Sequence, residues 1–135
     1  MRIAAGMCVA ALGVALVLGA KPATAVTRSD CPFKSNDDCD QWQYEQLDKE
    51  LSAVVEAAIA VMERHAKADW LPEAKLLFMQ AHRQWIVLRT DDCRSQVAYP
   101  GIISARTSKG KMAECQLTLT DRRIKELKAR FNLQK

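Results

Sequence analysis

The sequence is poor in the residues and patterns that catalytic and metal sites need. Its 135 residues include only two histidines, and no two cysteines stand in a C-x-x-C pair. No histidine lies near a cysteine, and the acidic residues follow no metal-ligand spacing. Glycine motifs for phosphate binding, dinucleotide binding or a serine nucleophile are also missing. We therefore expect no enzyme, no cofactor and no metal site.

A large excess of charge of one sign is missing as well. The formal net charge of +4 argues against a dedicated nucleic-acid binder. The charges are nevertheless unevenly distributed, with seven acids between residues 30 and 50 and nine bases between residues 106 and 135. Helix dipoles favour such a distribution, because acids stabilise helix N-termini and bases stabilise C-termini. The alternative is an acidic patch at Asp37, Asp38 and Asp40 that contacts a cationic partner.

The N-terminal segment has the pattern of a signal peptide. Arg2 precedes an almost unbroken apolar run over residues 3–20, and Ala23-Thr24-Ala25 is a small-x-small cleavage site. We expect removal of residues 1–25, a single domain over residues 26–135, and a periplasmic or secreted protein without a stable membrane anchor. An uncleaved anchor is the alternative, since the run approaches the length that spans a bilayer.

Four cysteines remain after this cleavage: Cys31, Cys39, Cys93 and Cys115. In a short exported chain they indicate two disulfides rather than a metal site. Three connectivities are possible, and the sequence alone does not choose among them.

Apolar residues at three- and four-residue spacing predict an all-α fold. The expected helices cover residues 37–67, 72–92 and 111–131. Pro72 suits the first turn of a new helix, and the short connection before it favours an antiparallel hairpin of the first two helices. The apolar face of the second helix is expected to contain Leu77, Phe78, Ala81, Trp85 and Leu88.

This hairpin brings its first and last turns together, and the third helix begins at the same end. We therefore expect all four cysteines at one end of the molecule, with Cys39–Cys93 and Cys31–Cys115 as the favoured pairing. The long segment 94–110 contains the turn signal Tyr99-Pro100-Gly101. Because long loops are often functional, Tyr99 is a candidate partner contact.

The stretch from Gln80 to Cys93 combines an aromatic anchor, a fixed charge and a cysteine. Trp85 and Arg89 are one helical turn apart, so the guanidinium can lie on the indole ring. Such a face is either a packing seam or a binding edge, and we favour the seam because a tryptophan at helical spacing is usually core.

The same stretch resembles the LprI-like lysozyme-inhibitor N-terminal domain family. The family pattern of Gln, Trp, Arg and Cys corresponds to Gln80 or Gln84 and then Trp85, Arg89 and Cys93. Its later run corresponds to the set Cys115, Thr120, Arg123 and Leu127, its cysteine pair to Cys31 and Cys39, and its Asp-x2-Leu element to Asp48 and Leu51.

Two features depart from the family pattern. Ser52 and Val55 stand where the family usually has Asn-x2-Tyr, and the usual Gly-Gly-Ser before the last cysteine is reduced to Gly101 and Ser104. The resemblance implies a binding module that occludes a protein partner, such as a lysozyme-type muramidase. The alternative is a cell-envelope interaction or stress protein with a different partner and no lysozyme inhibition.

Overall fold

The computed structural model describes residues 27–65, 71–99 and 107–133, and this part of the chain is helical. A 3-10 turn η1 (Arg28–Asp30) precedes the helices α1 (Asn36–His65), α2 (Leu71–Ala98) and α3 (Ser108–Arg130). The predicted all-α class is confirmed. The predicted signal peptide and the centre of the segment 94–110 lie outside the described residues.

The helix ends follow local chemistry. Asp37 and Asp38 occupy the first turn of α1, and Arg64 and His65 occupy its last, as the helix dipole favours. Thr107 caps α3, because its hydroxyl oxygen accepts from the Gly110 N–H at 3.1 Å.

Helix α2 continues six residues beyond its predicted end at residue 92, to Ala98. Polar side chains support the extra turn and a half, since Gln96 donates to Asp92 and Ser95 donates to the Asp92 carbonyl. Cys93 therefore lies within α2 and not at its end.

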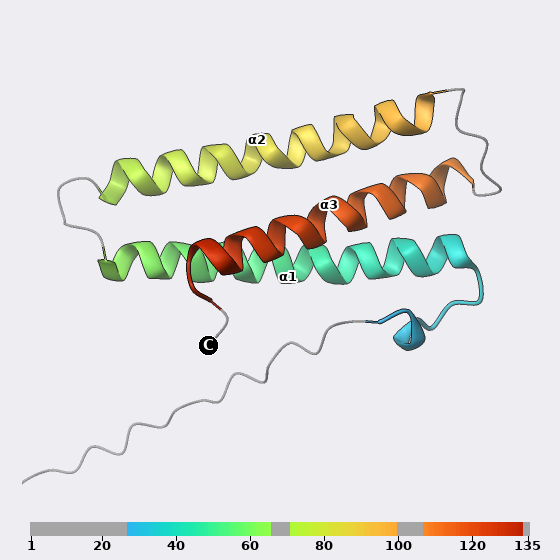
Figure 1. Ribbon diagram of the computed structural model, residues 1–135, viewed down its shortest axis with the longest axis horizontal. Helices are drawn as coiled ribbons and strands as arrows, with labels where there is room; N and C mark the ends of the chain where they lie inside the picture. The colour runs from blue at the N-terminus through green and yellow to red at the C-terminus, as the bar shows by residue number, and fades with distance from the viewer. Residues whose placement is uncertain (1–26, 66–70, 100–106, 134–135) are drawn as a thin grey trace, which may run out of the picture.

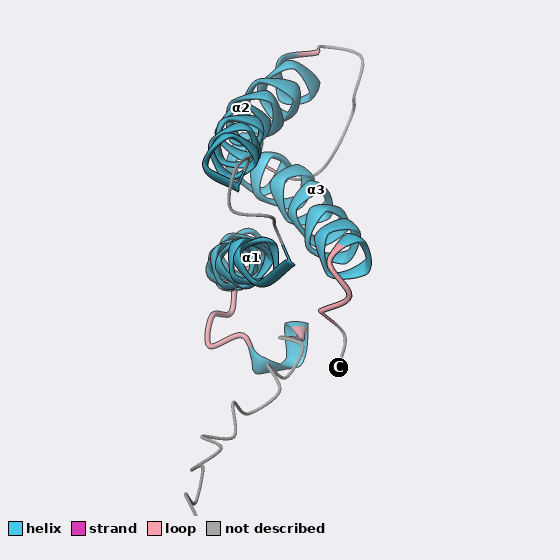
Figure 2. Ribbon diagram, turned by 90° about the vertical axis from the view of Figure 1, so that its left-hand side faces the viewer, coloured by secondary structure: helices cyan, strands magenta, loops and turns pink. Residues whose placement is uncertain are grey.

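The three described helices form a bundle in which α1 and α3 run in the same direction and α2 runs against both (Figure 1). The antiparallel arrangement of α1 and α2 is therefore confirmed. Most contacts between helices join α1 to α3, however, and α1 touches α2 at few points. Seen along the bundle, α2 is the outermost helix (Figure 2).

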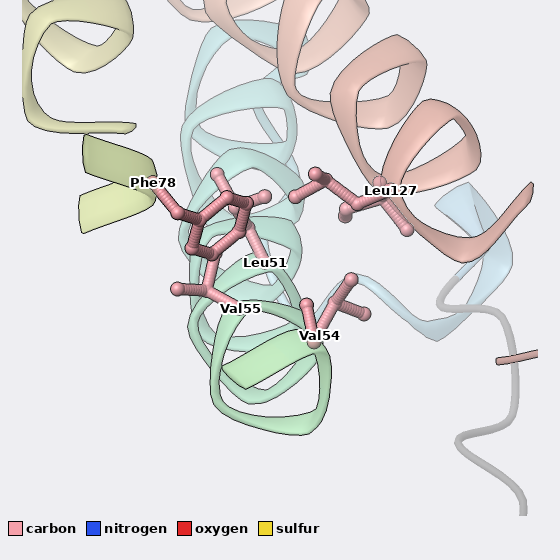
Figure 3. Packing of buried hydrophobic residues seen from close by; sticks show 7 residues of the cluster. Leu51, Val54, Val55, Phe78 and Leu127 are labelled. Atoms are coloured by element: carbon pink, nitrogen blue, oxygen red, sulfur yellow. The ribbon is translucent and has the colours of Figure 1, made fainter. Parts of the chain in front are cut away.

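The apolar core lies where the helices converge. Leu51, Val54 and Val55 of α1 face Phe78 of α2 and Leu127 of α3 (Figure 3). Each of these side chains is at most 9% exposed, and full burial of such a side chain contributes about 1.5–3 kcal/mol. Val55 is thus part of the core.

The predicted apolar face of α2 is only partly right. Phe78 is buried and Trp85 is partly buried, but Ala81 is exposed and Leu77 and Leu88 are 55% and 66% exposed. The inward face instead continues through Arg89 and Cys93. The polar contacts of Arg89 and the bond of Cys93 fix the rotation of the helix, and the two leucines then point outward.

The predicted disulfide pairing is wrong. Cys31 is bonded to Cys39, and Cys93 is bonded to Cys115, with Cα atoms 5.6 Å apart in each pair. Cys93 points toward α3, where Cys115 lies, and not toward the start of α1. The segment 27–35, which we call the N-terminal arm, folds back on α1 through the bond between Cys31 and Cys39. The expectation that all four cysteines form disulfides is confirmed. The start of α1, the end of α2 and the start of α3, which carry or adjoin these cysteines, lie at one end of the bundle (Figure 1). We call this the cysteine end.

Candidate functional site

Arg89 is the polar centre of the bundle. Its side chain is 3% exposed, and its Nη1 donates to Asp48 Oδ1 of α1 and to Thr120 Oγ1 of α3, both at 2.8 Å. Its Nη2 donates to the Tyr44 hydroxyl at 3.0 Å. One side chain of α2 is thereby tied to both other helices.

Aromatic rings surround this guanidinium. The Arg89 Cζ lies 5.1 Å from the Trp85 ring centroid and 5.2 Å from that of Tyr44. Arg123 also stacks on Trp85, at 5.6 Å, and pairs with Glu126 at 2.7 Å. Burial of the Tyr44 phenol raises its pKa. This set of stacked and hydrogen-bonded groups, which we call the arginine cluster, packs the helices together. Two of its guanidinium nitrogens, Arg89 Nε and Arg123 Nε, are buried without a hydrogen-bond partner. Arg89 therefore lies in the packing seam between the helices, with little of its side chain exposed.

His82 borders the arginine cluster and is its titratable neighbour near neutral pH. Its ring is stacked on Trp85 at 6.2 Å, and burial, followed by the charges of Arg123 and Arg89, lowers the pKa of His82 below 6.5. In the unfolded chain this histidine takes up a proton at a higher pH than in the folded protein. We expect the free energy of unfolding to be largest above pH 6.5 and to decrease as the pH falls through the lowered pKa.

This decrease is measured by denaturant unfolding at a series of pH values. His82→Gln is expected to flatten the profile on the acid side, because the titrating group is gone. A His82→Gln profile as steep as that of the unmodified protein would contradict the assignment.

The three candidate acidic contacts are engaged within the molecule. Asp37 accepts from the Thr107 hydroxyl at 2.5 Å, and a Cβ at Gly110 would overlap the Asp37 carboxylate, which would then have to move. Asp38 pairs with Lys109 at 2.7 Å, and the hydrogen bond and charge of that lysine lower the pKa of Asp38. Asp40 is 4% exposed and lies 3.6 Å from Arg28. These carboxylates join α1 to the N-terminal arm and to α3.

Two aromatic side chains remain exposed at the cysteine end. Tyr99, the candidate contact that follows α2, is 66% exposed, and Phe33, between the bonded cysteines of the arm, is 52% exposed. A shallow pocket of about 290 Å³ adjoins Phe33 and is lined by a mixed set of aromatic, acidic, basic and amide side chains: Phe33, Asp38, Gln41, Trp42, Glu45 and Lys109. A larger groove of about 500 Å³ separates the end of α2 from the start of α3.

Sequence reasoning located the family residues but missed several of their partners. Thr120 and Leu127 are fully buried, and Arg123 is largely so. Tyr44 and Asp48 were not recognised as the α1 side of the arginine cluster. Tyr44 and Asp48 are four residues apart, and Asp48 belongs to the Asp-x2-Leu element. This spacing indicates that the two side chains share one face of the helix. Nothing in the sequence marked Phe33.

Among the described residues, no three potential metal ligands come together, and no helix has the length and apolar character required to span a bilayer. The fold and the arginine cluster define a small helical module held by two disulfides. The family model "Lysozyme inhibitor LprI" matches residues 30–127, so the chain belongs to that family. No curated protein and no solved structure shows significant similarity to this chain.

Proposed function

We propose that this protein is an exported binding module that inhibits a lysozyme-type muramidase by occluding it, without chemistry of its own. The observation that carries the proposal is the family match, which spans most of all three helices, both disulfides and the arginine cluster. In this proposal residues 1–25 are removed on export, and residues 26–135 form the active domain. Its disulfides suit an oxidising compartment such as the periplasm or the extracellular space.

The cysteine end is the contact surface that we propose. Tyr99 and Phe33 supply exposed aromatic side chains of the kind that dominate binding energy at protein interfaces. The Cys31–Cys39 bond restrains the loop that carries Phe33, which reduces the entropy lost on binding. Because Asp37, Asp38 and Asp40 are engaged internally, their charge is a secondary contribution and the aromatic residues lead.

A titration of the purified mature protein against lysozyme turnover tests this proposal. We expect inhibition that weakens by about tenfold or more in Phe33→Ala and in Tyr99→Ala, as for truncation of an interface anchor. Met79→Ala is the control, since Met79 is exposed on α2 away from this surface. Asp38→Asn is expected to have a smaller effect that shrinks further at high salt.

Absence of inhibition across several lysozyme types at tens of micromolar protein overturns the proposed function, and the chain is then an envelope interaction protein with another partner. If inhibition is unchanged in both Phe33→Ala and Tyr99→Ala, the proposed function stands, but the contact surface lies elsewhere on the protein.

A further inference from the structure

Helix α2 carries an apolar surface on the side that faces away from the other helices. Leu76, Leu77, Val87 and Leu88 are 50%, 55%, 59% and 66% exposed, and we call these four residues the outer stripe. At 100° per residue, Leu76 and Val87 lie opposite the buried Phe78, and Leu77 and Leu88 lie on the adjoining flank. A helix that is apolar on both its inner and outer sides is normally covered on both.

The outer stripe is large for the surface of a small protein. These exposed fractions correspond to roughly 400 Å², which falls within the range of the largest apolar patches on monomers and is typical of interaction sites. The exposed fractions leave the stripe accessible to another molecule, and α2 itself is the outermost helix (Figure 2).

The order of residues along the stripe is self-complementary. Leu76-Leu77 and Val87-Leu88 form two apolar pairs, and the uncharged Gln80 and Gln84 lie on the same face between them. A two-fold axis beside residue 82 would place the first pair of one molecule against the second pair of another, with the helices antiparallel. Such an isologous contact closes after two subunits.

We infer that the outer stripe binds a second copy of this chain, forming an antiparallel α2–α2 dimer. The four side chains of each copy bury about 800 Å² in total, and the intervening glutamines add to this area. The interface is therefore a small one, in the range below roughly 1,200 Å² that is typical of weak, reversible association. An interface of this size without a large aromatic anchor corresponds to a dissociation constant of about 1–100 µM.

Charge near the axis opposes this association. Arg83 is exposed on one side of the stripe, one residue from the axis, so the two copies bring their Arg83 side chains toward each other. Like charges across an interface reduce affinity. In this geometry Arg83→Gln removes a repulsion and should strengthen the dimer. If Arg83 instead made a favourable contact across the interface, the same substitution would weaken the dimer.

Sedimentation equilibrium of the mature protein, from low to several hundred micromolar, tests the inference. We expect a reversible dimer whose dissociation constant rises at least tenfold in the double variant Leu77→Gln, Leu88→Gln. Both side chains are already exposed, so the variant keeps its fold, which circular dichroism checks. Met79→Gln makes a comparable change on the opposite flank of α2 and should leave the dissociation constant unchanged. Arg83→Gln is expected to lower it several-fold.

A protein that stays monomeric at several hundred micromolar overturns the inference, as does a double variant that dimerises as well as the unmodified chain. A weaker dimer in Arg83→Gln overturns the antiparallel arrangement. The inference is also overturned if the unmodified protein is monomeric and the double variant loses lysozyme inhibition, because the stripe would then contact the enzyme. The proposed function has its own readout, since dimerisation is measured without lysozyme.

Discussion

Replacing Arg89 by alanine is expected to lower the free energy of unfolding by about 3 kcal/mol, from lost packing and a hydroxyl left without its donor. The substitution removes the hydrogen bonds to Asp48, Tyr44 and Thr120 and leaves space between the helices. Thr120 is fully buried, so water cannot easily replace the lost guanidinium there. Asp48 is 44% exposed and can be hydrated, which limits the cost. Denaturant unfolding followed by circular dichroism measures the change.

Two further variants separate packing from polar contacts. Arg89→Met fills much of the space without donating hydrogen bonds and should recover about 1 kcal/mol relative to alanine. If Arg89→Ala does not fold, the unfolding of Arg89→Met is measured in its place. Arg94→Ala removes an exposed arginine from the same helix, whose 3.6 Å pair with Asp91 is open to solvent. That control should stay within about 0.5 kcal/mol of the unmodified protein. An Arg89→Ala effect as small as that of Arg94→Ala would show that the arginine cluster does not hold the helices together.

Removing the bond between α2 and α3 with the pair Cys93→Ala and Cys115→Ala should cost about 3 kcal/mol. The bond closes a sequence separation of 22 residues, and the unfolded chain gains conformational entropy when it is lost. Cys93 is also fully buried, so the substitution leaves a small cavity. Thermal and denaturant unfolding under oxidising conditions measure the loss.

The matched control is the pair Cys31→Ala and Cys39→Ala, which opens a separation of only eight residues and should cost about 2 kcal/mol. Its main effect should instead appear in binding, through Phe33. Peptide mapping without reduction tests the connectivity directly. A peptide that joins Cys39 to Cys93 would overturn both the pairing and the ranking of these two variants.

The sequence was sufficient for the helical class, the antiparallel course of the first two helices and the membership of Cys31, Cys39, Cys93 and Cys115 in disulfides. These features depend on local patterns: apolar spacing, a proline at a helix start and cysteine number. The spacing of four also placed Trp85 and Arg89 one helical turn apart, and the burial of Arg89 agrees with the packing role that the sequence favoured.

The rotation of α2 was not predictable from its apolar pattern. Leucine and valine occur all round this helix, so periodicity alone gave no unique inward face. The contacts of Arg89 with Asp48 and Thr120, which are 41 and 31 residues away in the chain, select one rotation and expose Leu77 and Leu88.

The disulfide pairing and the fate of the acidic residues also required the tertiary structure. The sequence placed four cysteines at one end of the molecule, and the position of α3 decided which sulfur atoms meet. Likewise, the sequence left open whether Asp37, Asp38 and Asp40 serve the helix N-terminus or form an acidic patch for a partner. In the structure they contact Thr107, Lys109 and Arg28, respectively, and so connect α1 to other segments. The local spacing of residues determines the secondary structure of each segment. Which face of a helix is buried depends on contacts between segments that are far apart in the chain, so local spacing does not determine it.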